Sequence, residues 1–180
     1  MKIRIIAGRY GGRLIKAPRG FVTHPMSERI KGALFNSLGS LEGLHVLDAF
    51  AGSGSLGLES LSRGAPHVTF VERDRFTMKV LRENVTLLGV NDQVKIQQRA
   101  VATWSDNTDD TFDLIFADPP YNDVQLSTVT RLFALLKPNG LMVLSYPGRG
   151  EAPTGTNGVV VVDNRSYGTA ALAFYRKEDV

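Results

Sequence analysis

The stretch Asp48-Ala-Phe-Ala-Gly52-Ser-Gly54-Ser-Leu-Gly57 decides the fold of this chain. It follows an apolar run at 44–50 and leads into a helical pattern at 55–63. Glycines at such a junction let the backbone approach a ligand closely at the N-terminus of a helix. Their spacing satisfies G-x-G-x-x-G, a pattern that serves dinucleotide sites and methyl-donor sites alike. The stretch therefore predicts an α/β fold with a nucleotide-like ligand at the end of a strand.

Strand-like and helical runs alternate on the C-terminal side of this stretch. The strand-like runs lie at 44–50, 68–72, 94–98, 112–117 and 141–145, and the helical patterns at 55–63, 75–88 and 124–136. Strands separated by helices form right-handed βαβ units, so a mostly parallel sheet is expected. The last two runs, 159–162 and 170–174, are joined by a short turn and are expected to pair antiparallel at one edge. This domain is expected to span residues 43–180.

Residues 1–42 are expected to form an extension that packs on this domain. Two short runs, 3–7 and 13–16, flank the turn Tyr10-Gly11-Gly12 and predict a β-hairpin. Ile30, Leu34 and Leu38 recur every four residues, which predicts an amphipathic helix.

The extension is strongly basic. Residues 1–31 carry eight Lys and Arg side chains against Glu28 alone, a net charge of +7, whereas the whole chain carries +3. A basic arm on a mildly acidic body is typical of attachments that bind polyanions, although a plain solvated hairpin would have the same composition. The side chains expected to contact such a polyanion are Arg4, Arg9, Arg13, Lys16 and Arg29.

Composition excludes several classes of site. The chain has no cysteine, which excludes disulfides, thiolate metal sites and a cysteine nucleophile. His24, His45 and His67 lack the spacing of metal ligands, so no metal is expected. With no apolar run of the roughly 20 residues that cross a bilayer, and no signal-peptide pattern, a soluble cytoplasmic protein that does not bind membranes is expected.

Two carboxylates at strand ends favour a methyl donor over a dinucleotide. Asp48 precedes the glycine loop, where it can face the cationic amino-acid end of such a donor. Glu72 ends the second strand and can accept hydrogen bonds from both ribose hydroxyls, while Asp74 is expected to cap the next helix. On the third strand, Gln98 or the backbone around Ala100 is left to contact the adenine.

The loop Asp118-Pro119-Pro120-Tyr121 follows the fourth strand. Its two prolines hold the backbone extended and remove two N–H donors, so the Pro119 carbonyl and the Asp118 carboxylate can both accept from one ligand. Two acceptors at one point suit an exocyclic amine. Tyr121 offers a face on which a planar base can stack. The loop therefore predicts methylation of a base amine, with a plain turn as the alternative.

Taken together, these residues resemble the bacterial 16S ribosomal RNA guanine-N2 methyltransferases. The resemblance covers nearly the whole chain, and its segments are Arg4-Ile-Ile-Ala-Gly8 with Gly12-Arg13, Pro25 with the helix from Glu28 to Leu38, Asp48 to Glu59, Val71 to Asp74, Asp118 to Tyr121, and Ser166-Tyr167-Gly168. It departs from the family near Arg99, where an acidic residue is common, and at His24-Pro25-Met26-Ser27, where Arg-Pro-Thr-Thr is typical.

The resemblance implies a Rossmann-like, seven-stranded class I fold, S-adenosylmethionine as methyl donor and one guanine of 16S rRNA as acceptor, in the free RNA or in an assembling small subunit. We expect a monomer. The implied catalytic residues are Asp118, Pro119, Pro120 and Tyr121. The implied donor-binding residues are Asp48, Phe50, Ala51, Gly52, Ser53, Gly54, Glu72, Arg73, Gln98, Ala100 and Asp118.

Other functions are compatible with part of this pattern. The nearest alternative is an S-adenosylmethionine-dependent amine methyltransferase that acts on adenine N6 or on a protein glutamine, because these enzymes share the glycine loop and a related Pro-Pro-Tyr loop. A dehydrogenase would need a substrate domain and a catalytic acid or base, and the sequence shows no candidate for either. A non-catalytic RNA-binding module would have no use for Asp48, Glu72 and Asp118.

Overall fold

The computed structural model describes residues 1–19 and 25–179. Its strands are β1 (Lys2–Arg4), β2 (Leu14–Lys16), β3 (His45–Ala49), β4 (His67–Val71), β5 (Val94–Gln97), β6 (Phe112–Ala117), β7 (Leu136–Pro147), β8 (Val159–Ser166) and β9 (Ala170–Lys177). Its α-helices are α1 (Glu28–Leu38), α2 (Ser55–Ser62), α3 (Arg75–Leu88), α4 (Val101–Asn107) and α5 (Leu126–Leu132), with single 3-10 turns at Asn91–Gln93 and Phe133–Leu135.

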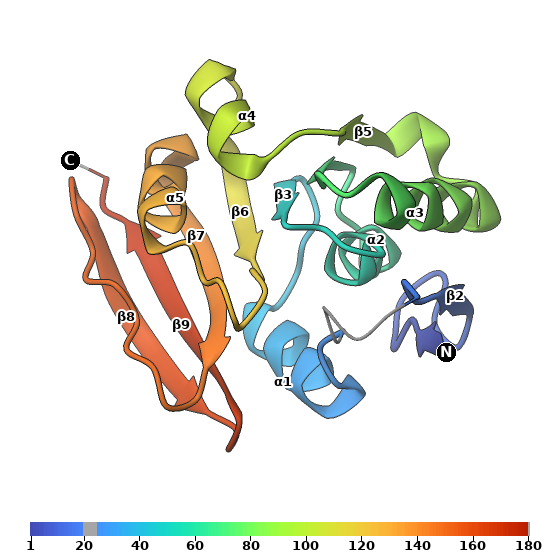
Figure 1. Ribbon diagram of the computed structural model, residues 1–180, viewed down its shortest axis with the longest axis horizontal. Coiled ribbons are helices and arrows are strands. Elements are labelled where there is room, and N and C mark those ends of the chain that lie inside the picture. The colour runs from blue at the N-terminus through green and yellow to red at the C-terminus, as the bar shows by residue number, and fades with distance from the viewer. Residues whose placement is uncertain (20–24, 180) are drawn as a thin grey trace.

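The described residues form one seven-stranded sheet and a separate two-stranded hairpin (Figure 1). The strand order of the large sheet is β5-β4-β3-β6-β7-β9-β8. Its first five strands are parallel, and β9 runs antiparallel to both β7 and β8. The predicted mostly parallel sheet with an antiparallel edge is confirmed.

Helices cover both faces of the sheet, because side chains alternate between the faces along each strand. Val46, Phe70 and Phe116 point to one face and pack with the apolar side chains of α1, α2, α3 and the hairpin. Leu47 and Ile115 point to the other face, against α4 and α5. The N-terminal extension therefore adds its own residues to the first of these two cores. The domain division at residue 43 stays a prediction.

The hairpin is shorter than the sequence predicted. Ile3 pairs with Ile15 in the ladder, but the amides of Ile6 and Ala7 leave it and donate to the carboxylate of Glu59, at 2.9 and 3.2 Å. This side chain on α2 replaces the cross-strand partners and fixes the hairpin against the domain.

Helix α4 was not predicted, since its sequence, Val-Ala-Thr-Trp-Ser-Asp-Asn, has weak helix propensity and no apolar repeat. Two buried residues, Val101 and Trp104, hold it against the second core, and the Trp104 and Phe112 ring centroids are 6.2 Å apart. Tertiary packing thus stabilises a helix that its local sequence does not favour. It also makes Trp104 a core residue.

Strand β7 begins earlier than expected. The segment Lys137-Pro138-Asn139-Gly140 was predicted to stop the preceding helix before a strand at 141–145, yet it lies inside β7 as a bulge, where Asn139 has φ +64°.

No helix in residues 1–19 and 25–179 has the length and apolar character needed to span a membrane.

Candidate active site

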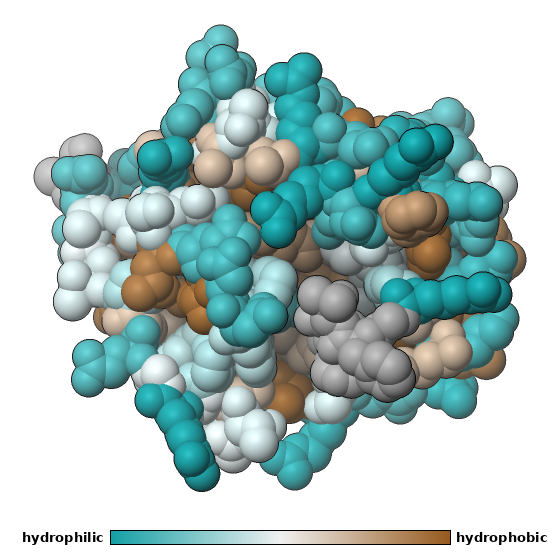
Figure 2. Space-filling model, viewed as in Figure 1, coloured by the Kyte–Doolittle hydropathy of each residue, from teal (hydrophilic) through white to brown (hydrophobic). Residues whose placement is uncertain are grey.

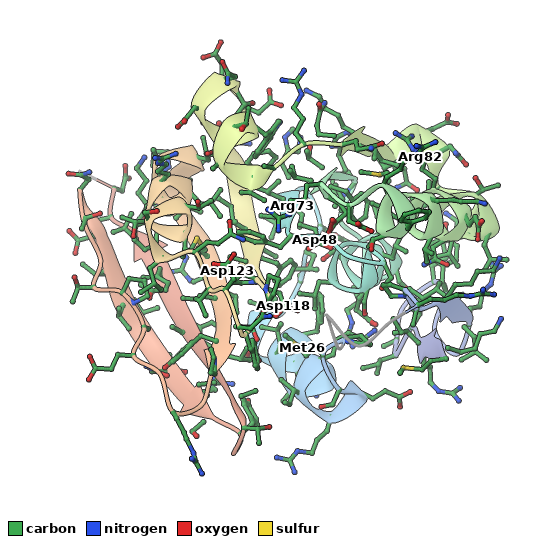
Figure 3. The ribbon with its side chains drawn as sticks, in the orientation of Figure 1. Met26, Asp48, Arg73, Arg82, Asp118 and Asp123 are labelled. Carbon is green, nitrogen blue, oxygen red and sulfur yellow. The ribbon has the colours of Figure 1, made fainter. Side chains whose placement is uncertain are left out.

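Three carboxylates meet at the carboxyl ends of neighbouring parallel strands. In the sheet register Ala49 of β3 pairs with Val71 of β4 and with Ala117 of β6, so Asp48 lies beside the positions where Glu72 and Asp118 leave their strands. In Figure 3 the labels of Asp48, Arg73 and Asp118 lie together near the middle of the molecule. The sheet thus assembles residues that are up to 70 positions apart in the sequence.

The glycine loop between β3 and α2 adopts backbone conformations that require glycine. Gly54 has φ +89°, and a Cβ atom there would lie 2.5 Å from the Leu81 side chain, so no larger residue fits. Gly52 has φ +57° and open space where its Cβ would be, which leaves its backbone accessible to a ligand. Phe50 also has positive φ, at +55°. The strained backbone at Phe50, next to two glycines in left-handed conformations, fits a loop shaped to hold a ligand.

Asp48 is 1% exposed, and its Oδ2 accepts a hydrogen bond of 2.9 Å from the amide of Gly57 in the first turn of α2. Burial raises the pKa of Asp48 well above its usual value, and the nearby charges of Asp118 and Glu72 raise it further. A cationic group bound here would stabilise the ionised carboxylate. The ammonium of a methyl donor's amino-acid end is such a group, so the site fits it.

Glu72 is held with its carboxylate at the mouth of the glycine loop. Its Oε1 accepts from the amide of Gly52 at 3.2 Å, and its Oε2 accepts from the amide of Asp74 at 2.9 Å. A carboxylate has about four lone-pair positions, so two remain for ribose hydroxyls. Asp74 caps α3 by accepting from Thr77 N at 2.8 Å, as predicted.

The expected adenine contacts lie in two different places. Ala100 forms the partly buried N-cap of α4, whereas the exposed Gln98 lines a groove on the outer side of α3 together with Lys16. The roles of both residues stay predictions.

The Asp-Pro-Pro-Tyr loop begins where β6 ends, between β3 and β7. Asp118 is partly buried, and burial raises its pKa to about 6, against an opposing effect of the Ser145 hydroxyl. The amide of Asp123 donates to the Pro120 carbonyl at 2.9 Å, which closes the loop into a turn. Asp118 is therefore a carboxylate that ionises close to neutral pH at the edge of the site.

Ser145 is a site residue that sequence reasoning missed. It ends the apolar run of β7 beside Asp118, and its Oγ lies 2.7 Å from the Tyr121 hydroxyl. This contact anchors one end of Tyr121, whose ring remains 42% exposed. A polar residue at the end of the otherwise apolar run 141–145 was the signal that could have identified it.

The basic arm is divided between exposed and buried side chains. Arg4 lies 3.6 Å from Glu28, Lys16 forms a 2.9 Å ion pair with Glu83, and Arg13 donates to the carbonyl of Leu87. Arg9 and Arg29 are exposed. Lys31 was counted in the +7 charge but is fully buried, so it cannot meet a phosphate. His24 lies outside the described residues.

This strand order, with a glycine loop after the first strand and acidic residues after its neighbours, defines a class I methyltransferase, the class that takes its methyl group from S-adenosylmethionine. The chain belongs to the family described as "Conserved hypothetical protein 95", which matches residues 3–176.

Named relatives agree with this assignment. The chain is 32% identical over 183 residues to YlbH of Bacillus subtilis, covering 97% of this chain and 99% of the relative. It is 35% identical over 150 residues to "Ribosomal RNA small subunit methyltransferase D" of Haemophilus influenzae, covering 78% of this chain and 77% of the relative. The solved structure of yhhF from Escherichia coli superposes with a TM-score of 0.89 at 27% identity and full coverage of both chains.

Proposed function

We propose that this protein transfers a methyl group from S-adenosylmethionine to the exocyclic N2 amine of one guanine in 16S rRNA. The observation that carries the proposal is the position of Asp118, in a proline-fixed loop beside Asp48 and Glu72. The printed name of the Haemophilus influenzae relative, a small-subunit rRNA methyltransferase, supports the substrate. We expect the protein to act as a monomer in the cytoplasm, on 16S rRNA or an assembling small subunit.

The donor would lie along the strand ends, between the glycine loop and the acidic residues. Asp48 would face its ammonium group, Glu72 its ribose, and the backbone from Phe50 to Gly54 would line its path, with Ala51, Ser53 and Arg73 adjoining. The bound donor supplies an electrophilic methyl group on its sulfonium. The open space at Gly52 supports this placement, because a ligand can contact that backbone directly.

The catalytic loop would prepare the amine of the base. The Asp118 carboxylate and the Pro119 carbonyl accept hydrogen bonds from its two N–H groups, which draws the nitrogen lone pair out of conjugation with the ring. The lone pair then forms the N–C bond as the S–C bond breaks, so the donor leaves as the neutral thioether. The cationic methylated amine then passes one proton to the Asp118 carboxylate or to solvent. Positioning provides most of the rate acceleration in such an in-line displacement. Tyr121 stacks on the base, which must be unpaired or flipped to enter.

The test is transfer of labelled methyl to bacterial 16S rRNA, free and in small subunits, with the modified nucleoside identified by mass spectrometry. We expect N2-methylguanine from the wild type. In Asp118→Asn one carboxylate oxygen, an acceptor, is replaced by an amide NH2, a donor, so we expect the rate of methyl transfer to fall by at least about 100-fold. Asp106→Asn removes an exposed carboxylate from α4 and serves as the matched control. Label on adenine or on protein glutamine would support the alternative amine methyltransferases, and methylated guanine made equally well by Asp118→Asn would exclude the loop chemistry.

A further inference from the structure

A groove of about 620 Å³ runs along the outer side of α3, beyond the donor site. Arg75, Lys79 and Arg82 line it at spacings of four and three residues, so they form one stripe on the helix. Lys16 of the hairpin contributes from the side, and the exposed Leu87 provides apolar surface. Figure 2 shows hydrophilic side chains over α3 with a small hydrophobic area among them, and Figure 3 places Arg82 on the outside of this helix.

The stripe has an excess of positive charge that nearby carboxylates do not neutralise. Lys16 is paired with Glu83, but among the described residues no carboxylate lies within 4.0 Å of the charged groups of Arg75, Lys79 or Arg82. Like charges at such spacings destabilise a helix. An anionic partner would offset this cost.

The groove leads from the candidate active site to the basic hairpin. Helix α3 begins three residues after Glu72, and at its other end the Arg13 guanidinium donates to the Leu87 carbonyl. The buried amide of Asn84 donates to the carbonyls of Lys16 and Ser53, at 2.8 and 3.0 Å, and so ties α3 to the hairpin and the glycine loop. These hydrogen bonds therefore hold the groove in a fixed position relative to the candidate active site.

An exposed aromatic side chain stands beside the stripe. Phe76 is 79% exposed in the first turn of α3. Glu83 and Leu87 follow it by seven and eleven residues, so Phe76 lies on the same side of the helix, next to the groove. Cations that follow a backbone, together with an aromatic ring on which a base can stack, are typical of surfaces that bind single-stranded nucleic acid.

We infer that this groove binds the sugar–phosphate backbone of the RNA segment next to the methylated base, with Phe76 as a stacking platform. The inference rests on the proposed function for the identity of the RNA. It extends the RNA contacts from the N-terminal arm to α3, whose cations lie more than 40 residues further along the chain than Arg29.

The test compares two double variants with the same loss of charge. Lys79→Gln/Arg82→Gln alters the groove, and Arg131→Gln/Arg176→Gln alters exposed arginines on α5 and β9, at the other end of the sheet. Binding of a 16S rRNA transcript is measured by fluorescence anisotropy over a series of salt concentrations. Thermal unfolding and calorimetric donor binding check that each variant keeps its fold and donor site.

We expect the groove variant to bind RNA about tenfold more weakly, with a salt slope smaller by about 1.4, because two phosphate contacts are lost. The control variant is expected to match the wild type, and Phe76→Ala to weaken binding without changing the slope. Equal losses in both double variants, or an unchanged slope in the groove variant, would overturn the inference. The inference would also be overturned if the groove variant bound free RNA as well as the wild type but bound assembled subunits more weakly. In that case the groove would bind an acidic protein of the subunit. A wild type that binds RNA through the groove but transfers no methyl group would contradict the proposed function alone.

Discussion

The ammonium of Lys31 lies 3.2 Å from the carboxylate of Glu59, and both side chains are fully buried. Lys31 also donates to the Arg4 carbonyl and the Ser55 hydroxyl, and Glu59 accepts from the amides of Ile6 and Ala7 and from Arg63. Burial lowers the pKa of Lys31 despite the opposing effect of Glu59. Burial alone would raise the pKa of Glu59, but its hydrogen bonds and the Lys31 charge together lower it. This pair joins the N-terminal extension to α2 in the core.

Removing the two partners is expected to have unequal effects. Glu59→Ala leaves a buried ammonium without its counter-charge and two amides without their acceptor, so we expect a loss of about 3–5 kcal/mol in the free energy of unfolding. Lys31→Met replaces the cation with apolar volume and leaves Glu59 paired with Arg63, so a smaller loss of about 1–3 kcal/mol is expected. Urea unfolding followed by circular dichroism measures both. Equal losses would show that the pair, rather than the amide contacts of Glu59, dominates.

Replacing Asp118 is expected to stabilise the protein at high pH. The folded-state pKa of about 6 lies above the usual value of 3.8, so the unfolded state ionises first. The resulting free-energy cost to the folded state is absent below about pH 4, grows between pH 4 and pH 6, and is constant at higher pH. Asp118→Asn removes that cost. We expect a gain of about 3 kcal/mol at pH 8 that disappears by pH 4, measured by urea unfolding across that range. A gain that does not vary with pH would point to altered packing instead.

The same ionisation is expected to limit methyl transfer. The ionised carboxylate of Asp118 is the form that accepts a strong hydrogen bond from the amine N–H and can take up its proton. For this reason kcat/KM should fall about tenfold per pH unit below pH 6. Single-turnover rates between pH 5 and 8 measure this dependence, and donor affinity measured over the same range is the control. A flat rate profile down to pH 5 would mean that the neutral carboxyl suffices.

Two substitutions separate the ring of Tyr121 from its hydroxyl. Tyr121→Ala removes the stacking surface, which is worth about 1–3 kcal/mol per base, so kcat/KM for RNA should fall by roughly 5- to 150-fold. Tyr121→Phe keeps the ring and loses only the 2.7 Å contact with Ser145, so a smaller effect is expected. Donor affinity is expected to stay the same in both. If Phe is as harmful as Ala, the hydrogen bond to Ser145 is the essential feature.

Asn84 is expected to couple stability to donor binding. Its fully buried amide accepts from the Lys16 amide and donates to the Lys16 and Ser53 carbonyls, so Asn84→Ala leaves three backbone groups without partners. We expect a loss of about 2–4 kcal/mol in unfolding free energy and weaker donor binding, measured by urea unfolding and calorimetry. Asn107→Ala, which removes an exposed hydrogen bond to Thr103 O, is the control and should cost less than about 0.5 kcal/mol. If Asn84→Ala leaves the donor affinity unchanged, the glycine loop does not depend on the hydrogen bonds of Asn84 for donor binding.

The sequence by itself determined the order and type of most helices and strands. It also placed Asp48, Glu72 and Asp118 at the carboxyl ends of their strands. Apolar periodicity and glycine loops are local signals, and parallel topology carries such residues to one edge of a sheet. The antiparallel edge and the cap at Asp74 were predictable from local signals of the same kind.

Only the tertiary structure decided which polar groups meet across long separations. Lys31 counts as one more basic residue until its partner Glu59, 28 positions away, is placed beside it in the core. Helix α4 exists because Trp104 is buried, Ser145 joins the site because β7 lies next to β6, and Lys16 joins the stripe on α3 because the hairpin packs there. Local sequence specifies the period of a segment, whereas burial and ion pairing depend on which segments pack together, and that choice belongs to the fold as a whole.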